Sequence, residues 1–273
     1  MAKILAVTNQ KGGVGKTTTS VNLAASLEAV KRRVLLIDLD PQGNATMGSG
    51  VDKGGLQHTV YQVLLGSKGV VDVRVSTSSG KYDLIPANRE LAGAEIELID
   101  LPGRETRLRE ALQEVEREYD FILIDCPPAL NLLTLNGLCA AEAVVIPMQC
   151  EYYALEGLSD LVNTIKKVRA HFNSSLEIEG LLRTMFDPRN ILAQQVSEQL
   201  QQHFGNRVYR TVIPRNVRLA EAPSFGVPAL YHDRLSKGTK AYLALAREIV
   251  ARYFPEGAVP DPQYEQRLEA EKI

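Results

Sequence analysis

Apolar runs and helix-spaced apolar positions alternate along most of the 273-residue chain. Several of the apolar runs have no polar alternation, which is typical of strands covered on both faces. The strand-like runs lie near residues 3–8, Val34–Leu39, Tyr82–Ile85, Phe121–Asp125, Ala143–Pro147, Glu179–Met185 and Arg207–Val212. Helical spacing recurs over residues 17–30, 104–118, 156–171, 190–204 and 237–253. This alternation predicts an α/β fold with a doubly wound, mostly parallel sheet and helices on both faces.

The last part of the chain departs from this pattern. Prolines at positions 255, 260 and 262 interrupt any preceding helix, and residues 263–272 are charged with almost no apolar face. We therefore expect one domain over residues 1–254 and a charged, proline-containing tail over residues 255–273. No apolar stretch reaches the roughly 18 residues that a membrane-spanning helix needs, and the tail does not look like a membrane anchor.

The N-terminus and the cysteines bear on the compartment. The first expected strand begins almost at Met1, so no secretion signal is evident. Cys126, Cys139 and Cys150 lack the paired spacing of a metal site. Sparse cysteines without a secretion signal are typical of reduced thiols, and we expect a cytoplasmic protein.

Charge is distributed unevenly, although the net charge of the whole chain is only −2. Residues 180–254 hold eleven Lys and Arg against five Asp and Glu, whereas the remainder holds twenty against twenty-eight. A basic segment of this kind can place a positive face against a polyanion. Charge alone is equally compatible with a set of ordinary solvated side chains.

A glycine-rich loop with two lysines follows the first expected strand and precedes the first expected helix. Its residues are Lys11, Gly12, Gly13, Val14, Gly15, Lys16, Thr17 and Thr18. Backbone N–H groups, a helix N-terminus and the charge of Lys16 would together bind phosphate, and the Thr17 hydroxyl would bind Mg²⁺. A structural turn would explain the glycines alone, but not the Lys-Thr-Thr that follows them.

Three aspartates come at the ends of expected strands, on the side of the sheet where ligands bind. Asp38 and Asp40 follow the second strand, and Asp125 ends a later one. We expect Asp40 to position or activate the attacking water, Asp38 to belong to the Mg²⁺ shell or a switch, and Asp125 to hold the ion through its waters. Strand-terminal aspartates are more commonly turn or cap residues, and the nearby glycine loop favours the functional interpretation.

Lys11 is the unusual residue of the loop. The common phosphate-loop pattern has glycine where this chain has Gln10, and Lys11 follows it. Lys11 is too early in the loop to wrap easily around the phosphates that Lys16 holds. We therefore expect it to reach a second copy of the chain, as an arginine finger supplied in trans does.

Three motifs resemble the deviant Walker ATPases: residues 11–18, Asp-Leu-Asp-Pro-Gln-Gly-Asn at 38–44 and Asp-Cys-Pro-Pro at 125–128. Residues 149–157 and 212–224 narrow the resemblance to the chromosomal ParA type, also called Soj, over about residues 2–252. The resemblance implies a bacterial chromosome- or plasmid-partitioning ATPase that uses ATP and Mg²⁺. It also implies an ATP-driven homodimer, sequence-independent DNA binding on the nucleoid, and slow hydrolysis stimulated by a ParB-type centromere-binding partner.

The resemblance also implies roles for single residues. Lys11 matches the lysine that crosses the dimer, Gly12 the glycine that permits close approach, and Asp40 the hydrolytic aspartate. Pro214, Arg215 and Asn216 fall where the family builds its adenine pocket. Arg189 and Arg218 match basic residues that the family uses for DNA. Lys237 and Lys240 lie in the same basic segment, where phosphate contacts would give sequence-independent affinity.

Other P-loop functions remain as alternatives. A MinD-like membrane-positioning ATPase needs a C-terminal amphipathic helix with a basic face, which residues 255–273 hardly provide. A nitrogenase-like reductase needs suitably placed cysteines, and Cys126 looks like part of a turn. An ATP-using ligase is a further alternative. A bacterial tyrosine kinase is another, but the ten tyrosines are scattered and form no terminal cluster.

Overall fold

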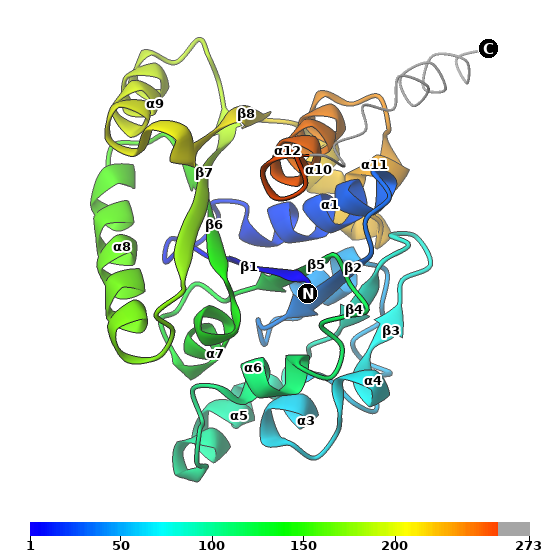
Figure 1. Ribbon diagram of the computed structural model, residues 1–273. Helices are drawn as coiled ribbons and strands as arrows, with labels where there is room; N and C mark the ends of the chain where they lie inside the picture. Colours follow the sequence, from blue (N-terminus) through cyan, green and yellow to red (C-terminus); the bar gives the residue numbers. More distant parts are fainter. Residues whose placement is uncertain (256–273) are drawn as a thin grey trace, which may run out of the picture.

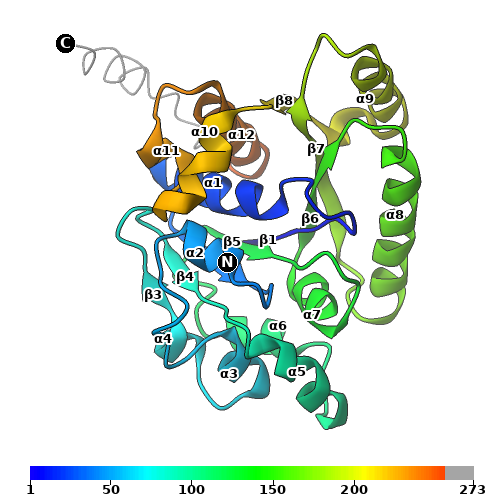
Figure 2. The same cartoon turned by 180° about the vertical axis from the view of Figure 1, so that it is seen from behind.

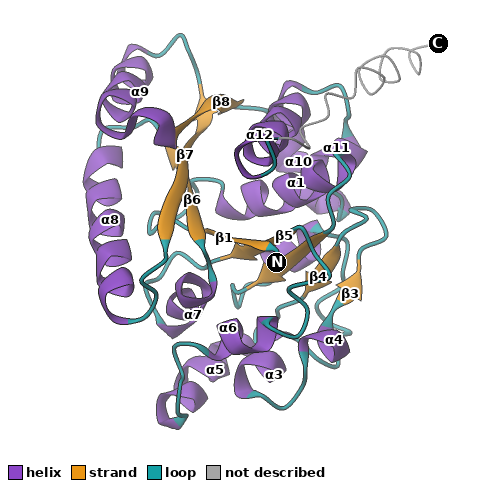
Figure 3. Ribbon diagram, viewed as in Figure 1, coloured by secondary structure: helices purple, strands orange, loops and turns teal. Residues whose placement is uncertain are grey.

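The computed structural model describes residues 1–255 and places them in an α/β fold built on one eight-stranded sheet (Figures 1 and 3). The strand order is β3-β4-β2-β5-β1-β6-β7-β8, and within the described residues only β3 and β4 pair antiparallel. The expected mostly parallel sheet is therefore confirmed. The strands are β1 (Lys3–Val7), β2 (Val34–Asp38), β3 (Val75–Ser76), β4 (Asp83–Ile85), β5 (Phe121–Asp125), β6 (Ala143–Gln149), β7 (Glu177–Phe186) and β8 (Val208–Pro214).

Helices cover both faces of the sheet, as the alternating pattern predicted (Figures 1 and 2). One face carries α1 (Lys16–Ala29), α2 (Asn44–Gly48), α10 (Val217–Glu221), α11 (Ala229–His232) and α12 (Lys237–Tyr253). The other carries α3 (Val60–Leu65), α4 (Val70–Val73), α5 (Leu91–Glu97), α6 (Arg107–Leu112), α7 (Leu132–Ala140), α8 (Ala154–His171) and α9 (Ile191–Phe204). Short 3₁₀ turns lie at Leu98–Asp100, Gly205–Arg207 and Ala222–Phe225.

The predicted C-terminal tail and the membrane question can be compared with the described residues. Apart from Pro255, the expected tail over residues 255–273 lies outside the described residues, so the domain boundary at residue 254 stays a prediction. Across the described part of the chain, no helix is both long and apolar enough to cross a membrane.

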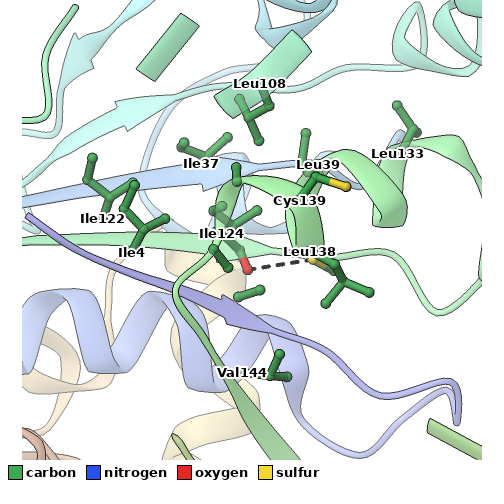
Figure 4. Close-up of a cluster of buried hydrophobic side chains, with 14 of the residues drawn as sticks. Ile4, Ile37, Leu39, Leu108, Ile122, Ile124, Leu133, Leu138, Cys139 and Val144 are labelled. Atoms are coloured by element: carbon green, nitrogen blue, oxygen red, sulfur yellow. Dashed lines mark hydrogen bonds between the residues drawn. The ribbon is translucent and has the colours of Figure 1, made fainter. Parts of the chain in front are cut away.

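The central strands are apolar throughout because each face of the sheet has its own buried cluster. In β1, Ile4 and Ala6 belong to the cluster shared with α3–α9, while Leu5 and Val7 belong to the cluster shared with α1 and α12. Figure 4 shows part of the first cluster, where isoleucines of the strands meet apolar side chains of α7. Full burial of each such side chain stabilises the fold by roughly 1.5–3 kcal/mol.

One expected helix is shorter than its sequence pattern. The helical spacing over residues 104–118 yields only α6, and the flanking residues form turns. Arg107 Nε donates to Leu64 O at 2.9 Å, and Val70 N donates to Glu114 Oε2 at 3.1 Å. Contacts with the end of α3 and the start of α4 thus override the local periodicity in this segment.

The carboxyl ends of the central strands meet at one edge of the sheet. Asp38 at the end of β2 and Val7 at the end of β1 both pair in register with Asp125, the last residue of β5. The loop that follows β1 therefore starts beside both aspartates. This edge is where ligands bind in parallel α/β sheets.

Candidate nucleotide-binding site

The glycine loop joins β1 to α1 and leaves the first turn of that helix open. Gly13 and Gly15 have φ values of 75° and 88°, which residues with a Cβ rarely adopt. Helix α1 begins at Lys16, and its N-cap Gly15 offers no side-chain acceptor to the first N–H groups. Those N–H groups and the helix dipole together favour an anion at this position.

Side chains from β6 and β7 hold the loop in place. Thr184 Oγ1 donates to Val14 O at 2.8 Å, and Gln149 Nε2 donates to Gly13 O at 3.1 Å. At Gly12, by contrast, an added Cβ would meet no atom within 4 Å. Packing within the chain therefore leaves space beside Gly12, which is compatible with the close approach of another molecule predicted there.

Lys16 lies inside the loop. Its exposed fraction is only 8%, and its Nζ donates to Lys11 O at 3.0 Å. Burial lowers the pKa of Lys16, while the charges of Asp125 and Asp40 oppose this shift. A buried ammonium with negative charges nearby is well placed to meet the phosphates of a nucleotide.

Lys11 has the opposite environment. Its side chain is 48% exposed and forms a 2.6 Å ion pair with Glu151, in the turn between β6 and α8. The Lys11 backbone is nevertheless fixed, because its N–H donates to Asn9 Oδ1 at 3.0 Å. The structure thus directs the two lysines of the loop to different surroundings. Gln149 and Glu151 belong to the family motif at residues 149–157, but the sequence predicted no contact for them with the loop, and Thr184 belongs to none of the motifs.

Asp38 and Asp125 are fully buried and use their oxygens differently. Asp38 Oδ1 accepts from Asp40 N at 3.1 Å, and its Oδ2 accepts from the Thr46 N–H and hydroxyl, each at 2.8 Å. Asp125 Oδ1 accepts from Ser20 Oγ at 2.8 Å, whereas Oδ2 has no hydrogen-bond partner. The carboxylate of Asp38 therefore anchors the residues after β2, and that of Asp125 keeps an unused oxygen.

The two buried carboxyls have raised pKa values. Burial raises the pKa of Asp38 to about 6, against hydrogen bonds from Thr46 and Asp40. Burial and the charge of Asp38 raise the pKa of Asp125 to about 8, against the hydroxyls of Ser20 and Thr17. Negative charge is therefore costly here unless a cation accompanies it.

The donor set fits a magnesium ion held mainly through water and nucleotide. The Asp125 carboxyl, of which Oδ2 is buried without a hydrogen-bond partner, lies near the Thr17 hydroxyl. Within residues 1–255, no cluster of three or more His, Cys, Asp or Glu is arranged to hold a metal by itself. Magnesium keeps several waters and needs few protein ligands when it binds with phosphates. The metal roles of Thr17, Asp38 and Asp125 stay predictions.

Asp40 lies in the turn after β2 and is only partly buried. Its Oδ1 accepts from Gln42 N at 2.9 Å, and its charge acts on Lys16. The turn ends at Gly43, where φ is 62° and an added Cβ would lie 2.7 Å from Ala87 O. Backbone geometry thus holds Asp40 at the mouth of the phosphate loop.

A cavity of about 520 Å³ opens beside Thr17 and Thr18, between α1, α2 and the turn Ala222–Phe225. The predicted adenine segment, residues 214–216, does not line this cavity. It begins at the last residue of β8 instead, where Pro214 pairs with Phe186, and the Asn216 side chain caps α10 by accepting from Arg218 N. The adenine role of Pro214, Arg215 and Asn216 therefore stays a prediction.

Comparison with known proteins agrees with this geometry. The AAA domain family matches residues 2–178. An uncharacterized protein of Pseudomonas putida is 62% identical over 252 residues, 92% of this chain and 96% of that one. The sporulation initiation inhibitor Soj of Bacillus subtilis is 55% identical (92% and 99% covered), and the chromosome partitioning protein ParA of Myxococcus xanthus 50% (94% and 90%). The chain belongs to the ParA/Soj family of P-loop ATPases.

Solved structures share the fold of this ParA/Soj-family chain. Cobyrinic acid a,c-diamide synthase of Mycobacterium smegmatis, solved with an ATP analogue and magnesium, is 38% identical with a TM-score of 0.81. The alignment covers 93% of this chain and 96% of that one. The cell division ATPase MinD of Pyrococcus furiosus is 27% identical with a TM-score of 0.75, covering 91% and 98%. The P-loop fold inferred from the sequence is confirmed.

The basic residues predicted to bind DNA in this ParA/Soj-family chain lie in two places. Arg218 of α10 and Lys237 and Lys240 of α12 lie on helices in close contact, because a Cβ at Gly238 would be 2.6 Å from Leu219 Cγ. Lys237 and Lys240 are exposed. Arg218 pairs with Glu221 at 2.8 Å and with Asp233 at 3.3 Å.

Arg189 lies apart from these helices, in the turn after β7. Its side chain is 89% exposed and pairs with Asp187 at 2.8 Å. The guanidinium of Arg189 and, more weakly, that of Arg215 hold the pKa of Asp187 down to about 2. The DNA-binding roles of all four residues stay predictions.

Proposed function

We propose that this chain is an ATP-dependent dimerising switch that binds DNA without sequence preference and hydrolyses ATP in chromosome or plasmid partitioning. One observation carries the proposal: the two lysines of one loop have opposite environments. Lys16 is 8% exposed within the loop, whereas the Lys11 side chain is 48% exposed on its outer side. One ammonium is suited to a nucleotide held by the same chain and the other to a second copy.

The chain's own groups account for nucleotide binding. N–H groups of the loop and the α1 N-terminus would hold phosphate oxygens, Lys16 would neutralise their charge, and Thr17 and Asp125 would orient the metal. When bound, Mg²⁺ supplies charge neutralisation on the phosphates. The relative from Mycobacterium smegmatis was solved with an ATP analogue and magnesium, which supports these two ligands here.

Asp40 is the residue we assign to hydrolysis. It lies at the mouth of the loop, where its carboxylate would orient or deprotonate the attacking water. We expect slow turnover, as the family resemblance implies. The resemblance also implies that a ParB-type partner stimulates this step.

Arg189, Arg218, Lys237 and Lys240, together called the basic surface, would hold or release DNA according to nucleotide state. These residues would contact phosphates, giving salt-sensitive affinity that is uniform across sequences. A cytoplasmic, nucleoid-associated location follows from this activity. The likeness to MinD favours one alternative, a membrane-positioning ATPase. Sedimentation with lipid vesicles and ATP separates the two functions, because only the alternative predicts co-sedimentation.

Substitution of Lys11 tests the proposal most directly. The wild-type chain should sediment as a dimer with ATP and as a monomer without it, whereas Lys11→Ala should stay monomeric. Nucleotide binding by the variant should remain, because Lys16 is unchanged. Lys68→Ala removes another exposed lysine and is the matched control. The proposal is wrong if Lys11→Ala dimerises and turns over ATP as the wild type does.

A further inference from the structure

The segment between β6 and α8 holds the outer side of the phosphate loop at two points. Gln149 Nε2 donates to Gly13 O at 3.1 Å, and two residues later Glu151 Oε2 meets Lys11 Nζ at 2.6 Å. Backbone hydrogen bonds from Glu151 N to Gln149 O and from Ala154 N to Glu151 O, both 3.0 Å, form the turn that places the carboxylate. The turn after β6 therefore positions Glu151, and the hydrogen bond from Gln149 holds the loop that carries Lys11.

The Lys11 backbone and side chain are held separately. Its N–H donates to Asn9 Oδ1 at 3.0 Å, and its carbonyl accepts from Lys16 Nζ, also at 3.0 Å. Both ammonium groups of the loop thus engage oxygens of their own chain. A backbone fixed in this way leaves only the Lys11 side chain free to swing, and Glu151 is the carboxylate that determines where it rests.

We propose that Glu151 is a positioning residue that holds Lys11 in cis and competes with a second copy of the chain for its ammonium. The proposal rests on the proposed function, in which Lys11 reaches across a nucleotide-dependent dimer. A phosphate of the nucleotide bound to the second copy must displace the Glu151 carboxylate before that phosphate can bind Lys11. Glu151 therefore sets how readily the nucleotide-bound chains pair.

The exposure of the pair makes this competition reversible. The side chains of Lys11 and Glu151 are 48% and 50% exposed, so water screens their attraction. An exposed ion pair of this kind shifts an equilibrium by roughly 1.4- to 5-fold. A symmetric dimer breaks two such pairs, so removing the carboxylate charge should strengthen pairing by about 2- to 25-fold.

Two measurements on Glu151→Gln test the proposal, with Glu156→Gln as the matched control. Glu156 is exposed in the first turn of α8 and belongs to the same segment. The first measurement, without nucleotide, is the rate at which an amine-acylating reagent modifies Lys11, quantified by mass spectrometry against Lys68 on the same chain. Release of Lys11 from Glu151 should raise this rate at least twofold in Glu151→Gln only.

The second measurement is the dissociation constant of the ATP-dependent dimer by sedimentation. We expect it to fall by about 2- to 25-fold in Glu151→Gln and to stay unchanged in Glu156→Gln. Thermal unfolding should be the same for both variants and the wild type, because a merely structural role of Glu151 would lower the stability of one variant instead.

The outcomes separate this proposal from the proposed function. An unchanged Lys11 acylation rate means that Glu151 does not hold Lys11, whatever the dimer does. A raised rate with an unchanged dissociation constant means that the hold exists but does not compete with pairing, which also overturns the proposal. A wild-type chain that forms no dimer with ATP refutes the proposed function, and the competition with it, while the acylation rate still reports the contact in cis.

Discussion

The phosphate-loop edge and the basic surface place their charges in opposite ways. At the loop edge Lys16 is 8% exposed, Asp38 and Asp125 are fully buried, and strands β6 and β7 supply hydrogen bonds that hold the loop. On the basic surface the Arg189 and Arg218 side chains are 89% and 53% exposed. Arg189 pairs with Asp187, and Arg218 pairs with Glu221 and Asp233. The first region is built for a fixed ligand, and the second can exchange its partners.

The energetic difference follows from burial. A buried charge that loses its partner is costly, commonly by several kcal/mol, so the loop edge needs its nucleotide and metal charges to stay in balance. An exposed ion pair contributes only about 0–1 kcal/mol. Arg189 can therefore exchange Asp187, and Arg218 can exchange Glu221 and Asp233, for DNA phosphates at little cost.

The largest expected effect separates hydrolysis from binding. Asp40→Ala should lower the rate of ATP hydrolysis by about 10²- to 10⁴-fold, because the water loses its orienting carboxylate. ATP-dependent DNA binding should persist, since Asp40 lies in the turn after β2 and is not one of the basic residues assigned to DNA. Steady-state phosphate release and DNA filter binding measure the two properties.

Asp52→Ala is the control for this substitution. Asp52 Oδ1 accepts from the backbone N–H two residues later at 2.9 Å, as Asp40 Oδ1 does. Equal losses of hydrolysis in the two variants, or undiminished hydrolysis in Asp40→Ala, would contradict the role given to Asp40.

The next largest effect is on the stability of the contact between α12 and β8, which supports the basic surface. Glu248 joins α12 to β8, because its carboxylate accepts from Arg210 N, Thr211 N and the Thr211 hydroxyl and pairs with Arg252. Although burial opposes the shift, these hydrogen bonds and the Arg252 charge lower the pKa of Glu248. Glu248→Gln should therefore reduce the free energy of unfolding by about 1–3 kcal/mol at neutral pH.

The pH dependence of that effect has a definite sign. A lowered folded-state pKa means that the unfolded chain takes up the proton first as pH falls. The stability from Glu248 is thus present above about pH 4.5 and is lost as pH falls through the folded-state pKa. Urea unfolding of wild type and Glu248→Gln should converge in that range. Exposed Glu198→Gln should show no difference at any pH, and a gap that persists in acid would refute the assignment.

The smallest effect is the loss of a single phosphate contact. Arg218→Ala should weaken ATP-dependent DNA binding by about three- to tenfold on every sequence and reduce the salt slope by about one. Arg33→Ala is the matched control: Arg33 is 62% exposed and paired with Asp120, at the opposite, amino-terminal end of the strands. Equal effects of the two substitutions would mean that Arg218 contributes only general charge.

Long, strongly patterned elements of this fold could be predicted from the sequence. Strands β1, β2 and β5 appear as apolar runs because both faces are buried, and α12 shows clear helical spacing. The two-residue β3 and short helices such as α3 and α4 have too few residues for a period to show. Their positions depend on tertiary contacts that a local pattern does not contain.

The residues of the candidate site also fall into those that the sequence predicts and those that it does not. Lys16, Thr17 and Asp125 could be predicted because the loop and the strand ends carry a recognisable spacing. The contacts of Ser20, Thr46 and Thr184 could not, because only the fold brings these side chains to the residues that they bind. The motif at residues 149–157 indicated the family but not the contacts of Gln149 and Glu151 with the loop. Thr184, for example, is 170 residues from the Val14 carbonyl that it binds.

The link between the two regions is the central claim, and DNA binding in three nucleotide states tests it most directly. The affinity of the wild-type chain for two unrelated DNA sequences should be measured with ATP, with ADP and without nucleotide, across a range of salt concentrations. We predict binding only with ATP, a steep fall in affinity with salt, and no preference between the sequences. Equal affinity in all three nucleotide states would contradict the switch.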